Sequence, residues 1–544
     1  MLKYCVGMIG TPAYPETSWS GSKLEELKRL GFNAMQLNIA WGCRPNDEPL
    51  NVEDVLVLPG QTPEVQAKAA KRRERIRSRL KLCKAHNMRA IFHFGAPFNG
   101  QGPYFGEKPK NCISDIAITE KYTYLLEELN VQIPGINDIL VYTYDQDAWL
   151  CSEFSSCKNC RGIPLDQRLP HFLTALCDKW REIRADGILW WESWELSAGQ
   201  VLKIAEKLPT ENFGLMAHSN TGEVQKTRAV DLWFQNLAAI AKKRGIPLVA
   251  ELFLGESSEE TEPLKRIPCP RLTYTQIKAV LGVPGVTGIK EYYGLLPETG
   301  DPCLNMVGET LKSFDVKVEA ALAELAKRYK EAAADMVTFW ELVAEGYMLY
   351  PWDVSWYARE VGRSCLDHGW HAAFLRGQQC STPSWESTRH AIFMKTDNSQ
   401  PHPWMLEDIQ LRCELSADRM KKAMAAGKKI IKLLSGSDAQ QMEESLESID
   451  MFCRICTGYV LHLRETNVAM LLREDEKKGN PLPEFLLQEL SELLKKDVEN
   501  QHEKGRVVKI QKEFEENARE WLHMYLVPTE TELQEKGPFS LTTR

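Results

Sequence analysis

Acidic side chains recur at the ends of four short segments that have the apolar, β-rich pattern of strands. They lie in the runs 142-YTYDQDAW-149, 190-WWESWE-195, 249-VAELFLGE-256 and 289-IKEYYG-294. Two carboxyl groups that flank a glycosidic bond can cleave it, one as a proton donor and the other as a carboxylate. The tryptophan rings in these runs can stack on the apolar faces of sugar rings. The combination predicts hydrolysis of a carbohydrate substrate without any organic cofactor.

The leading pair of catalytic candidates is Asp147 and Glu251, near the ends of the fourth and seventh predicted strands. In a retaining mechanism Asp147 protonates the leaving oxygen and later activates water, while Glu251 attacks the anomeric carbon. The carboxyl groups of a retaining pair lie about 5–5.5 Å apart, and those of an inverting pair about 6.5–9.5 Å apart. Because aspartate is one methylene shorter than glutamate, Glu192 or Glu195 on the fifth strand is the alternative proton donor.

Three other functions remain open. In a substrate-assisted hexosaminidase, Asp145 and Asp147 would orient an acetamido group and donate the proton, without a protein nucleophile. A non-catalytic glycan-binding barrel would bind sugar without hydrolysing it. In an isomerase or aldolase, Lys290 could form a Schiff base with a carbonyl substrate. An ion pair with the adjacent Glu291 is the simpler role for this lysine.

Further side chains near the predicted strand ends could hydrogen-bond a sugar hydroxyl or stack on a sugar ring. These substrate-binding candidates are Asn38, Trp41, His93, Trp149, Trp190, Trp194, His218, Asn220, Glu291 and Tyr292. Each type also has an ordinary structural role, since a single tryptophan often anchors a loop and a single acid often caps a helix. The prediction therefore depends on their coincidence at the strand ends.

The run 151-CSEFSSCKNCRG-162 places three cysteines just after the fourth predicted strand. Two thiolates in a C-x-x-C turn, here Cys157 and Cys160, can bind one cation, and Cys151 supplies a third ligand. Cys112, in the loop after the third strand, completes a four-thiolate set. A closed set of this kind leaves no position for a catalytic water. It predicts a structural zinc ion that joins two loops.

Eight β-rich runs alternate with amphipathic helical runs in residues 1–312. The predicted strands are Tyr4–Gly10, Ala34–Trp41, Arg89–Gly95, Asp138–Asp145, Gly187–Trp194, Phe213–Asn220, Pro247–Leu254 and Val286–Tyr293. Helical runs such as 22-SKLEELKRLG-31 repeat leucine at helical spacing and end at glycine. Because repeated strand–helix units require parallel strands, eight of them predict an α/β fold, a closed (β/α)8 TIM barrel. No predicted strand–helix junction carries G-x-G-x-x-G or a P-loop, which argues against a nucleotide-binding fold.

From residue 313 onward the strand pattern gives way to long helical patterns, such as 439–475 and 483–526. This change predicts a separate, mainly α-helical C-terminal domain over residues 313–544. Its helices carry leucine and methionine stripes wider than one core would cover. The stripes predict association into a homo-oligomer.

The overall composition narrows the class of protein. The 544 residues are 43% hydrophobic with a formal net charge of −8, which is typical of a globular protein and unlike the basic surface of a nucleic-acid binder. No apolar run approaches the roughly 20 residues that cross a bilayer, so no membrane contact is expected. The first residues read as a strand rather than a signal peptide, and the 15 cysteines suit reduced thiols or metal ligands. We therefore expect a cytoplasmic protein.

The segment from 145-DQDAWLC-151 to 157-CKNCRGIPLDQRLPHFL-173 resembles the region after strand four in β-galactosidases of glycoside hydrolase family 42. In that family an Asn-Glu pair closes strand four, cysteines bind zinc directly afterwards, and another zinc cysteine comes from an earlier loop. On this resemblance Gln146 and Asp147 take the places of the Asn and the acid/base Glu. The run 247-PLVAELF-253 resembles the strand-seven motif of the wider clan A, which implies that Glu251 is the nucleophile. The resemblance covers the barrel only.

Overall fold

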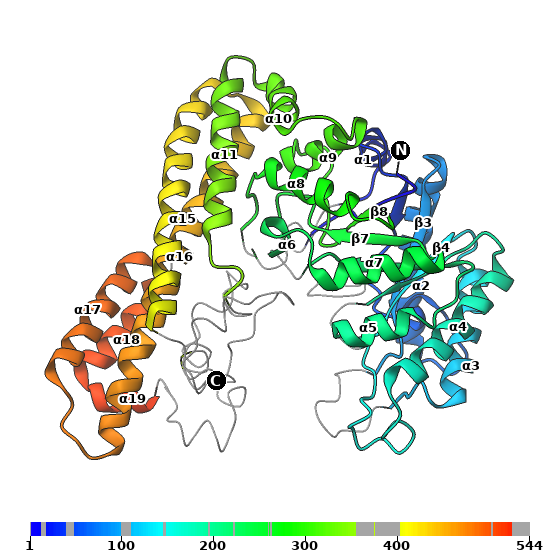
Figure 1. Ribbon diagram of the computed structural model, residues 1–544, viewed down its shortest axis with the longest axis horizontal. Coiled ribbons are helices and arrows are strands. Elements are labelled where there is room, and N and C mark those ends of the chain that lie inside the picture. Colours follow the sequence, from blue (N-terminus) through cyan, green and yellow to red (C-terminus); the bar gives the residue numbers. More distant parts are fainter. Residues whose placement is uncertain are drawn as a thin grey trace. The chain divides into compact units, whose positions relative to one another are not determined.

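The structure is a computed structural model, which describes residues 2–11, 18–39, 48–99, 110–144, 148–193, 196–220, 224–258, 261, 264–354, 375, 403–501 and 504–524. Eight parallel strands close into a barrel in the order of the chain (Figure 1). The strands are β1 (Tyr4–Gly7), β2 (Ala34–Gln36), β3 (Arg89–Gly95), β4 (Asp138–Tyr142), β5 (Leu189–Glu192), β6 (Phe213–His218), β7 (Leu248–Leu252) and β8 (Val286–Glu291). The predicted TIM barrel is confirmed.

Most strands are shorter than predicted, because the apolar pattern reports burial rather than strand pairing. β2 ends at Gln36, whereas its apolar run continues through Leu37 and Ile39, which are buried outside the strand. β5 likewise ends at Glu192 and not at Trp194. The sequence therefore predicted the positions of the strands well and their C-terminal ends less well.

The barrel interior contains an apolar layer below the ends of the strands. It is built by Tyr4, Val6, Ala34, Ile91, Leu140, Trp190, Met216 and Val249. Trp190 packs edge-on against Tyr4, with 4.7 Å between the ring centroids. Gly214 on the adjacent strand leaves room for the indole, since a Cβ there would lie 2.3 Å from the Trp190 ring. A large aromatic side chain thus fills the centre of the barrel.

Helices surround the barrel and bury their apolar faces against the outside of the strands. They are α1 (Gly21–Arg29), η1 (Val52–Val55), α2 (Pro63–Ala85), α3 (Ile116–Gln132), α4 (Leu165–Ile183), α5 (Ala198–Ala205), α7 (Leu232–Arg244), α8 (Pro270–Leu281) and α9 (Pro302–Lys312). The short α6 (Val224–Thr227) follows β6 in the chain. Several begin at a side-chain cap: the Ser20 hydroxyl accepts from the Lys23 amide before α1. Others end at a left-handed glycine, such as Gly245 after α7. These local signals place the loops that follow each strand.

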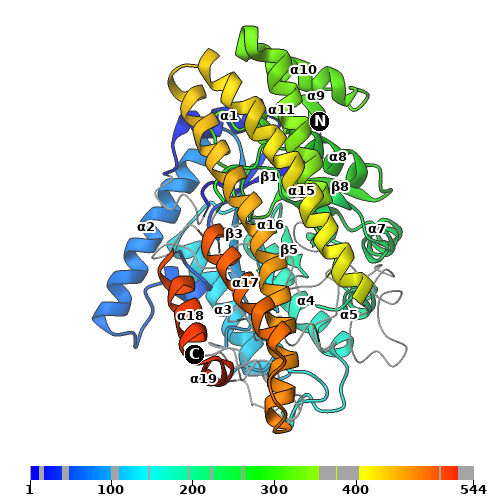
Figure 2. The same cartoon turned by 90° about the vertical axis from the view of Figure 1, so that its left-hand side faces the viewer.

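The C-terminal part is mainly helical, as predicted. Its elements are α10 (Val318–Ala326), η2 (Lys327–Ala332), α11 (Ala333–Leu349), α15 (Pro403–Ile430), η3 (Ile431–Leu433), α16 (Gly436–Lys477), α17 (Glu484–Asn500), α18 (Lys504–Glu516) and α19 (Ala518–Met524). α15 packs along α11 and α16, and α17 packs on α16 (Figure 2). Cys453 and Cys456 are buried core residues of α16, which agrees with their position in a helical pattern.

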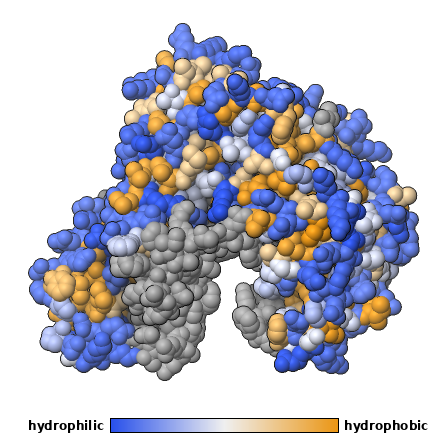
Figure 3. Space-filling model, viewed as in Figure 1, coloured by the Kyte–Doolittle hydropathy of each residue, from blue (hydrophilic) through white to orange (hydrophobic). Residues whose placement is uncertain are grey.

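Contacts divide the chain into two compact units. The first comprises Met1–Asn220, Arg228–Gly255 and Leu272–Ala321, and the second comprises Thr221–Thr227, Glu256–Arg271 and Leu322–Arg544. Hydrophilic residues predominate on the face shown in Figure 3, with separate apolar patches. Exposed apolar side chains on α15 include Leu411 and Leu415. Among the described helices, none has the length and hydropathy that a membrane span requires. The homo-oligomer stays a prediction.

Candidate active site

Six strands direct polar or ionisable side chains into one buried layer above the apolar layer. These residues are Gln36 on β2, His93 on β3, Glu192 on β5, His218 on β6, Glu251 on β7 and Lys290 on β8. Each side chain is at most 3% exposed. Alternate residues of a strand share a face, so Glu192 lies two residues above Trp190, and Glu251 two residues above Val249. The layer lies at the carboxyl ends of the strands, where the active sites of TIM barrels are found.

Lys290 lies between two glutamates at the centre of this layer. Its ammonium nitrogen is 2.7 Å from Oε1 of Glu251 and 4.0 Å from Oε2 of Glu192. Ligand atoms of the two glutamates and His218 lie within 4.8 Å of one another. His218 Nε2 is 3.3 Å from Glu251, and His93 Nε2 is 3.2 Å from Glu192. Each carboxyl group therefore faces one imidazole, and both face a single ammonium.

Burial and mutual repulsion give the two glutamates very different pKa values. Burial, together with the charge of Glu192, raises the pKa of Glu251 to about 8, against the attraction of Lys290. Burial also acts to raise the pKa of Glu192, but the charges of Lys290, His93 and His218 outweigh it and lower this pKa to about 2. Burial lowers the pKa of Lys290, and the two carboxylates more than reverse this effect. At neutral pH the pair thus holds one proton beside a charged ammonium.

Gln36 was not identified from the sequence, although it fixes the orientation of His93. Its amide Nε2 donates to the Asn38 carbonyl at 2.8 Å and lies 3.1 Å from His93 Nδ1. Because the amide nitrogen is a donor, it favours the tautomer that carries the ring proton on Nε2, facing Glu192. The available signal was a single amide side chain inside the apolar strand 34-AMQ-36.

Two substrate-binding candidates instead hold the backbone in place. Asn38 donates to the carbonyls of His93 and Pro49, and its oxygen accepts from the His93 amide at 2.9 Å. The carboxylate of Glu291 accepts from three backbone amides, those of Leu254, Tyr293 and Gly294. These hydrogen bonds fix the main chain near the strand ends, and the role of both residues in substrate binding stays a prediction. The ammonium of Lys290, the lysine beside Glu291, donates to Glu251 at 2.7 Å rather than to the adjacent acid.

Three aromatic candidates occupy different environments. Trp190 lies in the apolar layer with no exposed surface. Tyr292 packs edge-on against His218, with 4.1 Å between ring centroids. Trp149 is partly exposed and lies edge-on against Tyr144 at 4.8 Å. Of these rings, only Trp149 retains surface for a ligand.

Asn220 follows β6 and donates from Nδ2 to the Arg228 carbonyl at 2.7 Å. The remaining candidates lie outside the described residues: Trp41, Asp145, Gln146, Asp147, Trp194 and Glu195. Their predicted roles stay predictions.

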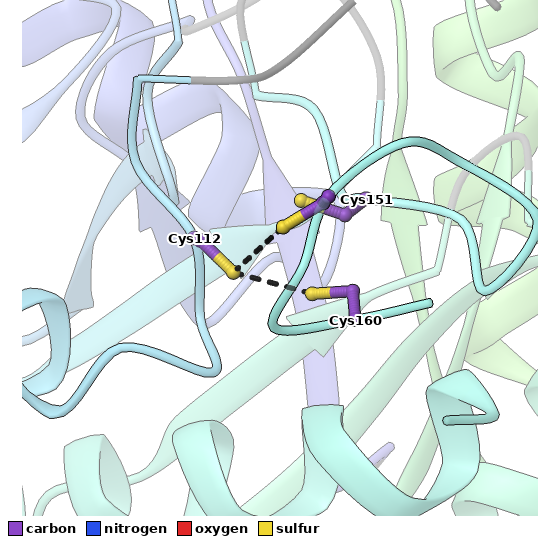
Figure 4. Close-up of side chains that lie close together, drawn as sticks. Cys112, Cys151 and Cys160 are labelled. Carbon is purple, nitrogen blue, oxygen red and sulfur yellow. Dashed lines mark hydrogen bonds between the residues drawn. The ribbon is translucent and has the colours of Figure 1, made fainter. Parts of the chain in front are cut away.

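The four predicted metal-binding cysteines converge in the loops after β3 and β4. Cys112, Cys151, Cys157 and Cys160 are all buried, and one sulfur from each lies within 4.8 Å of the others. The sulfur of Cys112 is 3.2 Å from that of Cys160 and 3.8 Å from that of Cys157. Figure 4 shows the thiols of Cys112, Cys151 and Cys160 pointing toward one another. Zinc bonds of about 2.3 Å place tetrahedral sulfurs about 3.8 Å apart, so this thiol set fits a soft cation.

The thiols also perturb one another's acidity. A hydrogen bond from Cys151 lowers the pKa of Cys112 to about 4, despite burial. The same hydrogen bond, together with burial, raises the pKa of Cys151. One thiolate is therefore favoured within the cluster before any cation arrives.

No protein-family model matches this sequence, and no curated protein matches it. The solved structure of a GH138 enzyme targeting pectin rhamnogalacturonan II aligns with a TM-score of 0.60 and 11% identity, over 95% of this chain and 62% of that protein. The protein CpGH84B aligns with a TM-score of 0.41 and 8% identity, over 96% of this chain and 77% of its own. A family 5 xyloglucanase from Paenibacillus pabuli aligns with a TM-score of 0.34 and 11% identity, over 57% of this chain and 98% of its own. The chain thus spans 62% of the length of the GH138 enzyme, with which it shares a fold.

Proposed function

We propose that this chain is a glycoside hydrolase that acts on small oligosaccharides or glycosides with the carboxyl pair Glu192 and Glu251. The observation that carries the proposal is the buried pair itself, with oxygens within 4.8 Å, at the carboxyl ends of β5 and β7. This spacing suits a retaining mechanism, which needs about 5–5.5 Å, better than an inverting one, which needs about 6.5–9.5 Å. The structures that the fold resembles include glycoside hydrolases.

The pKa values of the two glutamates suggest which one is the acid and which one is the nucleophile. Glu251, with a pKa raised to about 8, holds the proton at neutral pH and gives it to the leaving oxygen. Lys290 then stabilises the carboxylate left behind. Glu192 remains ionised and attacks the anomeric carbon, forming a glycosyl ester. Glu251 next removes a proton from water, which hydrolyses the ester and returns both residues to their starting states.

The resemblance to family 42 and clan A predicts a different assignment, with Asp147 as the acid and Glu251 as the nucleophile. Azide rescue separates the two assignments, because azide replaces a missing nucleophile. In E192Q, azide should attack the substrate directly and yield a glycosyl azide of inverted configuration, whereas in E251Q it should attack the glycosyl ester and yield a glycosyl azide of retained configuration. A glycosyl azide of inverted configuration from E251Q instead would assign the nucleophile to Glu251. Proton NMR of the first product anomer tests retention directly.

We also propose that Cys112, Cys151, Cys157 and Cys160 hold one structural zinc ion. The support is the convergence of four buried thiols at spacings a tetrahedral ion accepts. Zinc bound there would join the loop after β3 to the loop after β4 and take no part in bond cleavage. Metal analysis of the purified protein tests this, and about one zinc per chain is expected.

A further inference from the structure

Arg168 is a buried cation beside the cysteine cluster that neither the catalytic pair nor the thiol set accounts for. It lies in the first turn of α4 and is only 6% exposed. Nη2 donates to the Cys151 carbonyl at 2.7 Å, and Nε donates to the Ile163 carbonyl at 2.9 Å. The guanidinium thereby connects the first cysteine of the loop to Ile163, three residues after the last cysteine.

The third nitrogen of this guanidinium has no such partner. Nη1 is buried and donates no hydrogen bond to any of the described residues. A buried donor without an acceptor costs about 1–3 kcal/mol, so its retention calls for an explanation. The hydrogen bond to the Cys151 carbonyl holds this guanidinium beside the thiol cluster.

Metal binding would create a negative charge at the thiol cluster, beside the Arg168 guanidinium. Four thiolates around one Zn²⁺ carry a net charge of about −2, since each ligand must be deprotonated. The cysteines are at most 8% exposed, so water compensates this charge poorly. Lys158 and Arg161, the other cations of the loop, are exposed. Arg161 Nη1 is directed at the carbonyls of Phe154 and Ser155.

We infer that Arg168 is the charge-balancing partner of the four-thiolate centre. It fixes the loop through hydrogen bonds to two carbonyls, and its Nη1 donates to the metal-bound sulfurs. It is thus a positioning residue for the metal rather than a ligand. The inference rests on the proposed zinc and is independent of the proposed glycosidase activity. Removing its charge should weaken zinc binding while leaving the four ligands in place.

The test is zinc affinity, measured by competition with a chromophoric chelator on the full chain. Arg168→Gln keeps polar contacts but loses the charge, and should weaken zinc about 10–100-fold, the usual effect of a residue that supports metal ligands. Arg168→Lys keeps the charge and should lose less than Arg168→Gln. Arg161→Gln is the matched control in the same loop and should bind zinc like the wild type.

Cobalt(II) spectra of the same proteins report ligand geometry separately from affinity. The thiolate charge-transfer and d–d bands should persist in Arg168→Gln, at higher cobalt concentration. Equal zinc affinity in Arg168→Gln and the wild type would overturn the role of Arg168 alone. A wild type that binds neither metal would overturn the zinc centre with it. If Arg168→Gln does not fold, an affinity of Arg168→Lys lower than that of Arg161→Gln by about 100-fold or more would refute charge balance, because lysine keeps the charge.

Discussion

The barrel contains two buried clusters of ionisable side chains, one of carboxyl groups on strands and one of thiols on loops. The carboxyl cluster has its own cation, because Lys290 lies 2.7 Å from Glu251 and 4.0 Å from Glu192. The thiol cluster has four acidic groups and no cation within the set. In the carboxyl cluster, protein groups alone balance the negative charge. In the thiol cluster, a metal ion and a cation outside the set are needed to balance it. Similar burial thus suits one cluster to proton transfer and the other to structure.

The largest effect is expected when Lys290, the cation inside the carboxyl cluster, is removed. Lys290→Met leaves two carboxyl groups buried without their ammonium, and should cost about 3–5 kcal/mol of unfolding free energy. Urea unfolding measures this loss. The matched control is Lys179→Met, which removes ion pairs with Glu127 and Glu182 at the surface and should cost far less stability. The double variant Lys290→Met/Glu251→Gln should recover part of the loss. A single variant as stable as the control would contradict the account.

Metal removal should affect the thiol cluster alone. Cys157→Ser should lose the zinc and lower the melting temperature by about 3 °C, corresponding to roughly 2 kcal/mol in a domain of this size. A chelator should bring the wild type to the same value and leave the variant unchanged. Cys177→Ser, a buried cysteine of α4 outside the cluster, should keep its zinc. Zinc content that survives Cys157→Ser would remove the site.

The raised pKa of Glu251 predicts how stability depends on pH. The pKa rises from its ordinary 4.5 to about 8 on folding, so the folded chain binds the proton more tightly than the unfolded chain. The resulting stabilisation is fully present below about pH 4 and is lost as the pH rises through 8. Glu251→Gln is neutral at every pH and should therefore melt about 2–4 °C above the wild type at pH 9. At pH 4 the two should coincide, and parallel curves would refute the shift.

The smallest expected effect concerns the tautomer of His93. Gln36→Leu removes the donor that lies 3.1 Å from Nδ1, so the ring proton no longer favours Nε2. Loss of one such hydrogen bond is worth about 1 kcal/mol, or roughly a fivefold fall in kcat. Nitrogen NMR of the labelled imidazole should show a mixture of tautomers. An unchanged tautomer with an unchanged kcat would show that Gln36 only fills space.

The fold could be predicted because buried parallel strands read as short apolar runs, as in 89-RAIFHFG-95. The site could be predicted only in part, since adjacent residues of a strand face opposite ways. In 289-IKEY-292 the sequence does not tell whether Lys290 or Glu291 faces the interior. The structure directs Lys290 to the carboxyl pair and Glu291 to backbone amides. The burial of Trp190 is also hard to predict from the sequence, because its depth in the barrel depends on the space left by Gly214.

The most direct test of the central claim is turnover of a panel of nitrophenyl glycosides by the wild type, E192Q, E251Q and D147N. The account predicts measurable wild-type hydrolysis of at least one glycoside, and a fall in kcat of about 10³-fold or more in both E192Q and E251Q, because each removes one of the two essential carboxyl groups. D147N should retain activity within about tenfold of the wild type, a change of roughly 1.4 kcal/mol in the barrier. Loss of turnover in D147N with E192Q still active would contradict the assignment and place the acid on the fourth strand.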